Sequence, residues 1–327
     1  MQALIEIIVP VFALMAIGYL AGRLGLFGQA NVGVLTQVTF VLFMPPLLFR
    51  AMATVDMTSL SFSSLATYYS VALTVLFVFV VGQAMTGQTL NSAMIRSLGA
   101  VFSNMAIIGT PIIQLSFGSD GLAILLPIIA LHALILLTVS TLVLEWSIAT
   151  EQSKENNHLS SSNGARSHGP NYGAIVFQAL RSAIIHPVVL PILLGLLWGA
   201  THWELPVVAD RTLALLGQAG IPASLVLLGA TLASYGLRTS SLPAILLSLG
   251  KLIVMPGLMY VAGRWVFDLA PLPLAVVTVC AALPTGANVY LLSQRYGTQV
   301  ATISATCALS TLGAVLTLSL LLPFFAK

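Results

Sequence analysis

The chain has 327 residues, of which 58% are hydrophobic and 6% are charged, and its formal net charge is +3. The charged fraction is about a quarter of that in an average soluble domain, and the mean hydropathy is +1.02. So few polar residues cannot cover a soluble surface, and the basic residues are scattered, which argues against a cytosolic enzyme and a nucleic-acid binder. The composition is that of an integral membrane protein.

Ten apolar stretches are each long enough to cross a bilayer as a helix, which takes about 20 residues. The first five are expected near residues 3–22, 32–53, 63–84, 93–117 and 121–146. The second five are expected near residues 175–200, 207–234, 241–266, 271–294 and 298–323. The predicted fold class is therefore an all-α integral membrane protein, whose ten spans are numbered here in chain order.

A polar stretch at residues 150–172, rich in Ser, Asn and Gly, separates the two sets of spans and is expected to be a solvated, disordered linker. The domains are thus 1–149 and 173–327, and they resemble each other at a shift of 177 residues. Three matched pairs stand out, namely Pro10 with Pro187, Gly18 with Gly195, and Gly22 with Gly199. Since each domain has an odd number of spans, the second enters the membrane from the opposite side. Such an inverted repeat is typical of secondary transporters.

Basic residues are unequally divided between the two ends of the predicted spans. With the N-terminus outside, eight Lys and Arg residues fall on the cytoplasmic side and four on the other. The positive-inside rule therefore predicts that both termini are outside and that the linker is cytoplasmic, in a multi-pass protein of the cell (inner) membrane.

Spans four and nine, which occupy the same place in the two domains, contain residues that interrupt helices. Proline removes an amide donor and glycine permits unwinding. Irregular backbone at this depth needs a protein or water-filled environment. Thr110 before Pro111 has the form of an N-cap followed by a first-turn proline, so a second half-helix is expected to start there. Thr285 and Asn288 are expected to serve span nine similarly.

Two half-helix N-termini near the midplane would present free amides and positive dipole ends, which together favour an anion. The alternative is a pair of ordinary proline kinks. The residues assigned to substrate binding are Asn104, Thr110, Pro111, Pro284, Thr285, Gly286, Asn288 and Tyr290. Because motifs such as HExxH and GxSxG are missing, no catalytic residue, metal site or cofactor is predicted.

Four motifs resemble the auxin efflux carrier family of membrane transporters, which includes bacterial carriers of small organic acids. They are Asn104-x4-Gly109-x-Pro111, Pro284-Thr285-Gly286-x-Asn288-Val289-Tyr290, Lys251-Leu252-x3-Pro256, and the stretch from Pro10-Val11 to Gly18-Tyr19. The resemblance covers the whole chain except the linker. One departure is visible in span six, where the chain reads His186-Pro187 and relatives tend to read Asn-Pro.

The resemblance implies the fold of bile-acid sodium symporters, in which a scaffold of spans one, two, six and seven stands beside a transport core of spans three to five and eight to ten. The broken helices of the core are expected to cross at the substrate site. The resemblance also implies an elevator movement of the core against the scaffold, and a homodimer.

Two ionisable residues within the spans each have two interpretations. His132, in span five, is either a proton acceptor or substrate ligand, or a hydrogen-bonded packing residue. Lys251, in span eight, either faces the cavity and balances an anion or lies at the membrane interface.

The leading functional hypothesis is a secondary active transporter of a small organic anion, either a carboxylate or an auxin-like acid. Its expected partners are the substrate, the lipid bilayer and a second copy of the chain. The first alternative is a sodium-coupled symporter of the same fold, although no Asp or Glu at a span centre supplies a cation ligand. The second is a membrane-embedded enzyme or sensor, which would need a catalytic constellation or a soluble output domain.

Overall fold

The computed structural model describes residues 2–26, 29–54, 61–159, 177, 181, 185, 188–234 and 242–325. Every named element of this part of the chain is a helix, and its extended pairing is an isolated antiparallel bridge between Ser103 and Thr285. Six helical segments are long and apolar enough to cross a membrane, namely Asn31–Ala53, Phe62–Met85, Met105–Ile148, Val207–Thr231, Leu242–Val266 and Val300–Phe325. The prediction of an all-helical, multi-pass membrane protein is confirmed.

Helices occupy the positions of the first three predicted spans. They comprise α1 (Gln2–Arg23), then α2 (Gln29–Val38), η1 (Thr39–Phe43) and α3 (Met44–Ala53), and then α4 (Phe62–Met85). The second of these spans is continuous because η1 is a single π-helical turn within it. The start of α4 is capped by Ser61, whose hydroxyl accepts a hydrogen bond from the amide of Ser64 at 3.2 Å.

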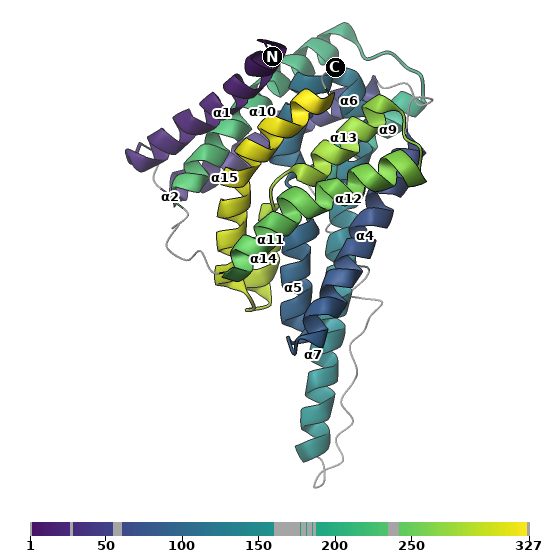
Figure 1. Ribbon diagram of the computed structural model, residues 1–327. Coiled ribbons are helices and arrows are strands. Elements are labelled where there is room, and N and C mark those ends of the chain that lie inside the picture. The colour runs from purple at the N-terminus through teal and green to yellow at the C-terminus, as the bar shows by residue number, and fades with distance from the viewer. Residues whose placement is uncertain are drawn as a thin grey trace.

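Spans four and five comprise α5 (Leu90–Val101), η3 (Met105–Gly109), α6 (Thr110–His132), η4 (Ala133–Leu137) and α7 (Thr138–Leu159). Gly118 interrupts α6 with a φ of 64°, so it marks the boundary between the two spans. α7 continues to Leu159 and projects from the rest of the molecule (Figure 1). The expectation of a disordered linker is therefore wrong for residues 150–159, and residues 160–172 lie outside the described part.

The second half contains α9 (Val189–Ala200), α10 (Val207–Ser234), α11 (Leu242–Leu249), η6 (Gly250–Val254), α12 (Met255–Val261), η7 (Ala262–Val266), α13 (Pro271–Ala282), α14 (Ala287–Arg295) and α15 (Val300–Phe325). The segment 242–266 is one helical span with two π-helical turns, and span nine is interrupted between α13 and α14. His186 and Pro187 lie outside the described residues.

Two close helix contacts join the two halves of the chain. α1 lies beside α10 (Figure 1), and α3 packs against α9. A Cβ atom on Gly18 would lie 1.8 Å from the carbonyl oxygen of Val226, and one on Gly195 would lie 2.5 Å from that of Phe49. The two contacts follow the 177-residue shift, because Gly18 corresponds to Gly195 and Phe49 to Val226. Glycine is required at both positions for the backbones to approach so closely.

A second group of helices packs around α5 and α13, the helices that lead into the interruptions of spans four and nine. α5 contacts α4, α7, α11, α14 and α15, and α13 contacts α4, α6, α12 and α15. Large side chains of this group are fully buried, among them Leu98 of α5 and Leu125 of α6. The interrupted backbone is therefore surrounded by protein, as irregular backbone at membrane depth requires.

Candidate anion site at the crossing of two interrupted helices

The interruption of span four is three residues long. α5 ends at Val101, and a π-helical turn starts at Met105, where the amides of Ile108 and Gly109 both donate to the carbonyl oxygen of Asn104 at 3.2 Å. The chain is therefore already helical before Thr110, whose hydroxyl donates to the carbonyl oxygen of Met105 at 3.3 Å. The prediction that Thr110 caps the second half-helix is wrong, because Asn104 occupies that position.

The interruption of span nine lies where the sequence places it. α13 ends at Ala282, and α14 starts at Ala287 with Gly286 as its N-cap residue, in an extended conformation with φ −74° and ψ 144°. Leu283 is extended as well, with ψ 151°. Pro284 and Thr285 therefore lie in the break itself.

The two interruptions cross and pair through their backbones. The amide of Asn104 donates to the carbonyl oxygen of Pro284 at 2.9 Å, and the amide of Gly286 donates to that of Phe102 at 3.0 Å. A Cβ atom on Gly286 would lie 2.8 Å from the ring of Phe102, so this pairing needs glycine. The antiparallel bridge fixes the starts of η3 and α14 relative to each other.

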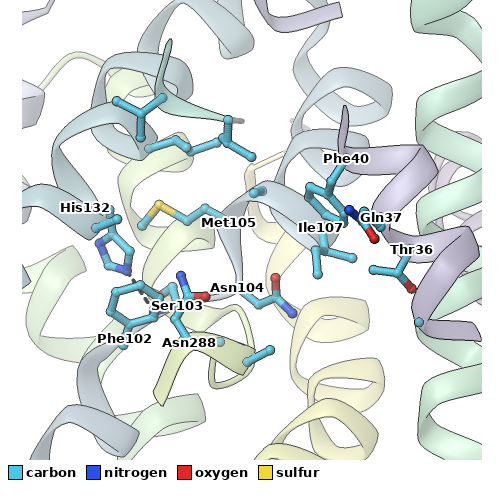
Figure 2. Close-up of a pocket in the computed structure, with 18 residues that line it drawn as sticks. Thr36, Gln37, Phe40, Phe102, Ser103, Asn104, Met105, Ile107, His132 and Asn288 are labelled. Carbon is cyan, nitrogen blue, oxygen red and sulfur yellow. Dashed lines mark hydrogen bonds between the residues drawn. The ribbon is translucent and has the colours of Figure 1, made fainter. Parts of the chain in front are cut away.

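A cavity of about 360 Å³ opens beside this crossing (Figure 2). Its lining includes four of the predicted functional residues, namely Asn104, His132, Gly286 and Asn288. The opposite wall is formed by Gly33, Thr36 and Gln37 of α2, Phe40 of η1, and Val188 and Val189 at the start of α9. In Figure 2, Asn104 and Ile107 lie between the His132 and Phe102 side and the side of Thr36, Gln37 and Phe40.

The cavity offers hydrogen-bond donors without a full positive charge. Among the described residues, its lining contains no Lys, Arg, Asp or Glu. Asn104 is 9% exposed and lines the cavity, and Asn288 lines it as well. Ala106 and Ala287 belong to the first turns of η3 and α14, where amides lack an intrahelical acceptor. The positive ends of two helices and the carboxamides of Asn104 and Asn288 therefore meet at one place.

Pro284 and Thr285, which were also assigned to substrate binding, lie beside the cavity without lining it. Pro284 contributes its carbonyl oxygen to the bridge, and the hydroxyl of Thr285 donates to the carbonyl oxygen of Gly99 at 2.7 Å. Thr285 and Asn104 both border a smaller cavity of about 120 Å³ on the α10 side.

The other three residues assigned to substrate binding are Thr110, Pro111 and Tyr290, and they do not line the cavity either. Thr110 and Pro111 are buried in the first turn of α6. The phenol oxygen of Tyr290, in α14, accepts a hydrogen bond from the Gln294 amide at 2.9 Å. These contacts stabilise the half-helices that present Asn104 and Asn288.

His132 is hydrogen-bonded and buried. Its Nε2 accepts the backbone amide of Ser103 at 3.1 Å, and its ring lies 4.2 Å from that of Phe102, measured between centroids. The side chain is 3% exposed and borders the cavity. These contacts favour the packing interpretation of His132.

Lys251 takes neither of the two places that the sequence suggests. It is fully buried in η6, so it does not lie at the membrane interface, and it is not among the residues that line the cavity. Its Nζ donates to the carbonyl oxygen of Ala281 in the last turn of α13. A cation at a helix C-terminus interacts favourably with the helix dipole.

Sequence reasoning missed the wall of the cavity that α2 supplies. Thr36 and Gln37 are polar residues within an otherwise apolar span, together with Gly33. That pattern was the available signal, because polar side chains inside a span usually face protein or a cavity rather than lipid.

Several membrane-spanning helices and a cavity beside a helix interruption are typical of a multi-pass membrane transporter. The chain belongs to the membrane transport protein family, which it matches over residues 3–322, and this is the auxin efflux carrier family that the motifs indicated. The family assignment also confirms that the protein is a transporter and not an enzyme.

Three relatives are similar over much of the chain. A "Putative malonate transporter" of Rhizobium meliloti (strain 1021) is 24% identical over 327 residues, which cover 98% of this chain and 96% of the relative. "Auxin efflux carrier component 8" of Arabidopsis thaliana is 25% identical over 225 residues, 60% of this chain and 61% of the relative. An "Uncharacterized transporter" of Methanothermobacter thermautotrophicus is 24% identical over 322 residues, 96% of each chain.

Proposed function

We propose that the protein is a secondary active transporter of a small organic anion that binds where η3 and α14 begin. The observation that carries the proposal is the cavity at the N-terminal ends of η3 and α14, which Asn104 and Asn288 line and whose described lining has no charged side chain. Helix N-termini favour anions because their free amides and dipoles point toward the ligand. The cavity volume of about 360 Å³ is within the range of small-molecule sites.

Neutral donors suit a carrier, which must bind its substrate and release it in every cycle. A carboxylate held by Asn104, Asn288 and first-turn amides leaves without breaking a desolvated ion pair. A buried lysine or arginine in the same cavity would hold the anion more strongly and slow its release. The name of the Rhizobium meliloti relative supports a carboxylate substrate and makes malonate the first compound to test.

An inverted repeat of ten spans is the second part of the proposal. It is supported by the paired contacts of Gly18 with Val226 and Gly195 with Phe49, which follow one sequence shift. It is also supported by the positions of the chain ends, because the start of α1 and the end of α15 lie at the end of the molecule opposite the tip of α7 (Figure 1). Both termini are then outside, and the linker is cytoplasmic.

An elevator movement fits the place of the cavity. One wall comes from α2, η1 and α9, which belong to the expected scaffold, and the other comes from η3, α6 and α14 of the expected core. Movement of the core along the scaffold would carry Asn104 and Asn288 past Phe40 and Val189 to the other side of the membrane. A homodimer joined through the scaffold, as the resemblance implies, would hold that scaffold still during the movement.

A thermal-shift screen of the purified protein tests the proposal. The compounds are malonate and indole-3-acetate, each compared with its neutral amide, at two pH values and with or without sodium. A ligand that binds only the folded state raises the unfolding temperature. We expect at least one acid to do so and its amide not to. Equal shifts for acid and amide, or none with any acid, would contradict an anion site.

A further inference from the structure

We infer that His132 and Ser310 are a matched pair of positioning residues, each of which holds one half of the crossing so that the anion site keeps its shape. The inference rests on the proposed function for what the site binds. It rests on backbone hydrogen bonding for how the site is held.

The bridge leaves two backbone amides facing away from each other. Ser103 and Thr285 are the directly opposed residues, and the hydrogen bonds of the bridge are made by their neighbours on either side. In an antiparallel pair of this type, the amides of the opposed residues point outward and need other acceptors. Both residues are 2% exposed, so water does not satisfy them.

Each outward amide finds an acceptor on the next span along the chain. The Ser103 amide donates to Nε2 of His132 near the end of α6, and the Thr285 amide donates to the hydroxyl oxygen of Ser310 in α15, both at 3.1 Å. The two acceptors differ in chemistry but meet the same need in the two halves.

Both acceptors are oriented by further contacts. The hydroxyl of Ser310 donates to the carbonyl oxygen of Cys307 at 3.3 Å, which commits its hydrogen and leaves a lone pair for Thr285. The ring of His132 is held against Phe102 and Tyr68, with centroid distances of 4.2 and 5.7 Å. Because Nε2 accepts a hydrogen bond, the neutral imidazole carries its proton on Nδ1.

These contacts reach the anion site through the backbone. Asn104 follows Ser103 directly, and Asn288 is three residues after Thr285, at the start of α14. Loss of either acceptor leaves a buried amide unpaired, and the cost of that state favours a shift of the extended segment. The carboxamides would then lose the geometry in which they meet one anion.

Hydrogen–deuterium exchange read by mass spectrometry tests the positioning role without a substrate. His132→Leu removes an acceptor and should speed exchange in a peptide that covers residues 102–104, and Ser310→Ala should do so at 284–286, each by roughly 5- to 150-fold. His132→Gln and Ser310→Thr retain an acceptor and should restore protection. Ser140→Ala is the matched control, because the hydroxyl of Ser140 is buried and donates to Leu136 within its own helical segment at 2.7 Å. Unchanged exchange in both acceptor-free variants overturns the inference.

Malonate binding then separates positioning from general stability. His132→Leu should weaken binding in the parent protein but add little to Asn104→Ala, because both act on the same contact. Independent, additive losses would overturn the inference. His132→Met serves in place of His132→Leu if the latter is not monodisperse. Failure of the parent to bind malonate counts against that substrate and leaves the exchange result to decide the role of His132 and Ser310.

Discussion

The hydroxyl of Thr285 donates a hydrogen bond to the carbonyl oxygen of Gly99 at 2.7 Å, which joins span nine to the last turn of α5. Carbonyl groups in the last turn of a helix lack an intrahelical donor, so this one depends on Thr285. The contact gives the interrupted spans a link beyond the backbone bridge.

Thr285→Val keeps the shape of the side chain but leaves the Gly99 carbonyl group unpaired. We expect a loss of about 1 to 3 kcal/mol in the free energy of unfolding, the usual cost of an unsatisfied buried acceptor. Denaturant unfolding of the purified protein measures it. Thr278→Val is the matched control, because that buried hydroxyl donates to Leu274 of its own helix at 2.7 Å. Equal losses for the two variants would show that the contact with Gly99 stabilises the fold no more than a hydrogen bond within one helix does.

The close approach of α1 to α10 is tested by adding a single methyl group. Gly18→Ala would place Cβ 1.8 Å from the carbonyl oxygen of Val226, so the helices must move apart. We expect a loss of about 1 to 3 kcal/mol, typical of overpacking. Gly82→Ala in α4 is the control, because its Cβ would meet nothing within 4 Å, and alanine favours a helix. Thermal unfolding in detergent should separate them, and similar behaviour would refute the close contact.

Much of the fold was predictable, because the length of an apolar stretch indicates a membrane span and polar or helix-breaking residues within it indicate an interruption. The ends of α10 and the segment 242–266 agree closely with the predicted spans at 207–234 and 241–266. The break at Pro284 and Gly286 was predictable from helix-breaking residues. Its partner was placed too late, at Thr110, because a π-helical turn at Met105–Gly109 carries no distinctive residue pattern.

The site was predictable only as far as polar groups stand out in apolar spans. Asn104 and Asn288 were found in this way and line the cavity. The role of Ser310 was not predicted, because it depends on the fold, which brings its hydroxyl to the Thr285 amide from 25 residues along the chain. A tertiary contact of this kind has no local sequence signal, and the same holds for the Lys251 contact with Ala281.

Tyr296, which follows α14 and lies outside the spans, gives a pH dependence. Burial raises the pKa of its phenol to about 12 from the ordinary value of 10.0, and its hydrogen bond to Glu145 acts in the same direction. The folded state therefore holds this proton more tightly than the unfolded state. The stabilisation is complete below pH 10 and is lost as the pH rises to about 12.

Tyr296→Phe removes this titration. The parent should lose stability relative to the variant between pH 10 and about 12, as measured by the difference in their unfolding temperatures across that range. A difference that stays constant with pH would exclude a contribution from Tyr296.

The proposed topology is tested with cysteine labelling in intact cells. A cysteine at Ser161, within the linker of residues 150–172, should resist a membrane-impermeant maleimide, because the distribution of basic residues predicts a cytoplasmic linker. Labelling should appear once the cells are permeabilised. The buried thiols of Cys280 and Cys307 provide the background measurement in the protein without the new cysteine. Efficient labelling from outside would reverse the orientation.

The central proposal is that Asn104 and Asn288 bind the substrate anion, and malonate binding by their alanine variants tests it most directly. Each variant removes a carboxamide that can donate to the anion, which should weaken binding by about 1 to 3 kcal/mol, or roughly 5- to 150-fold. Ser140→Ala, a buried change away from the cavity lining, should bind like the parent. All variants must match the parent in expression and monodispersity. Calorimetric titration should show both asparagine variants weakened and the serine variant unchanged, whereas parental affinity in both asparagine variants would contradict an anion site at the crossing.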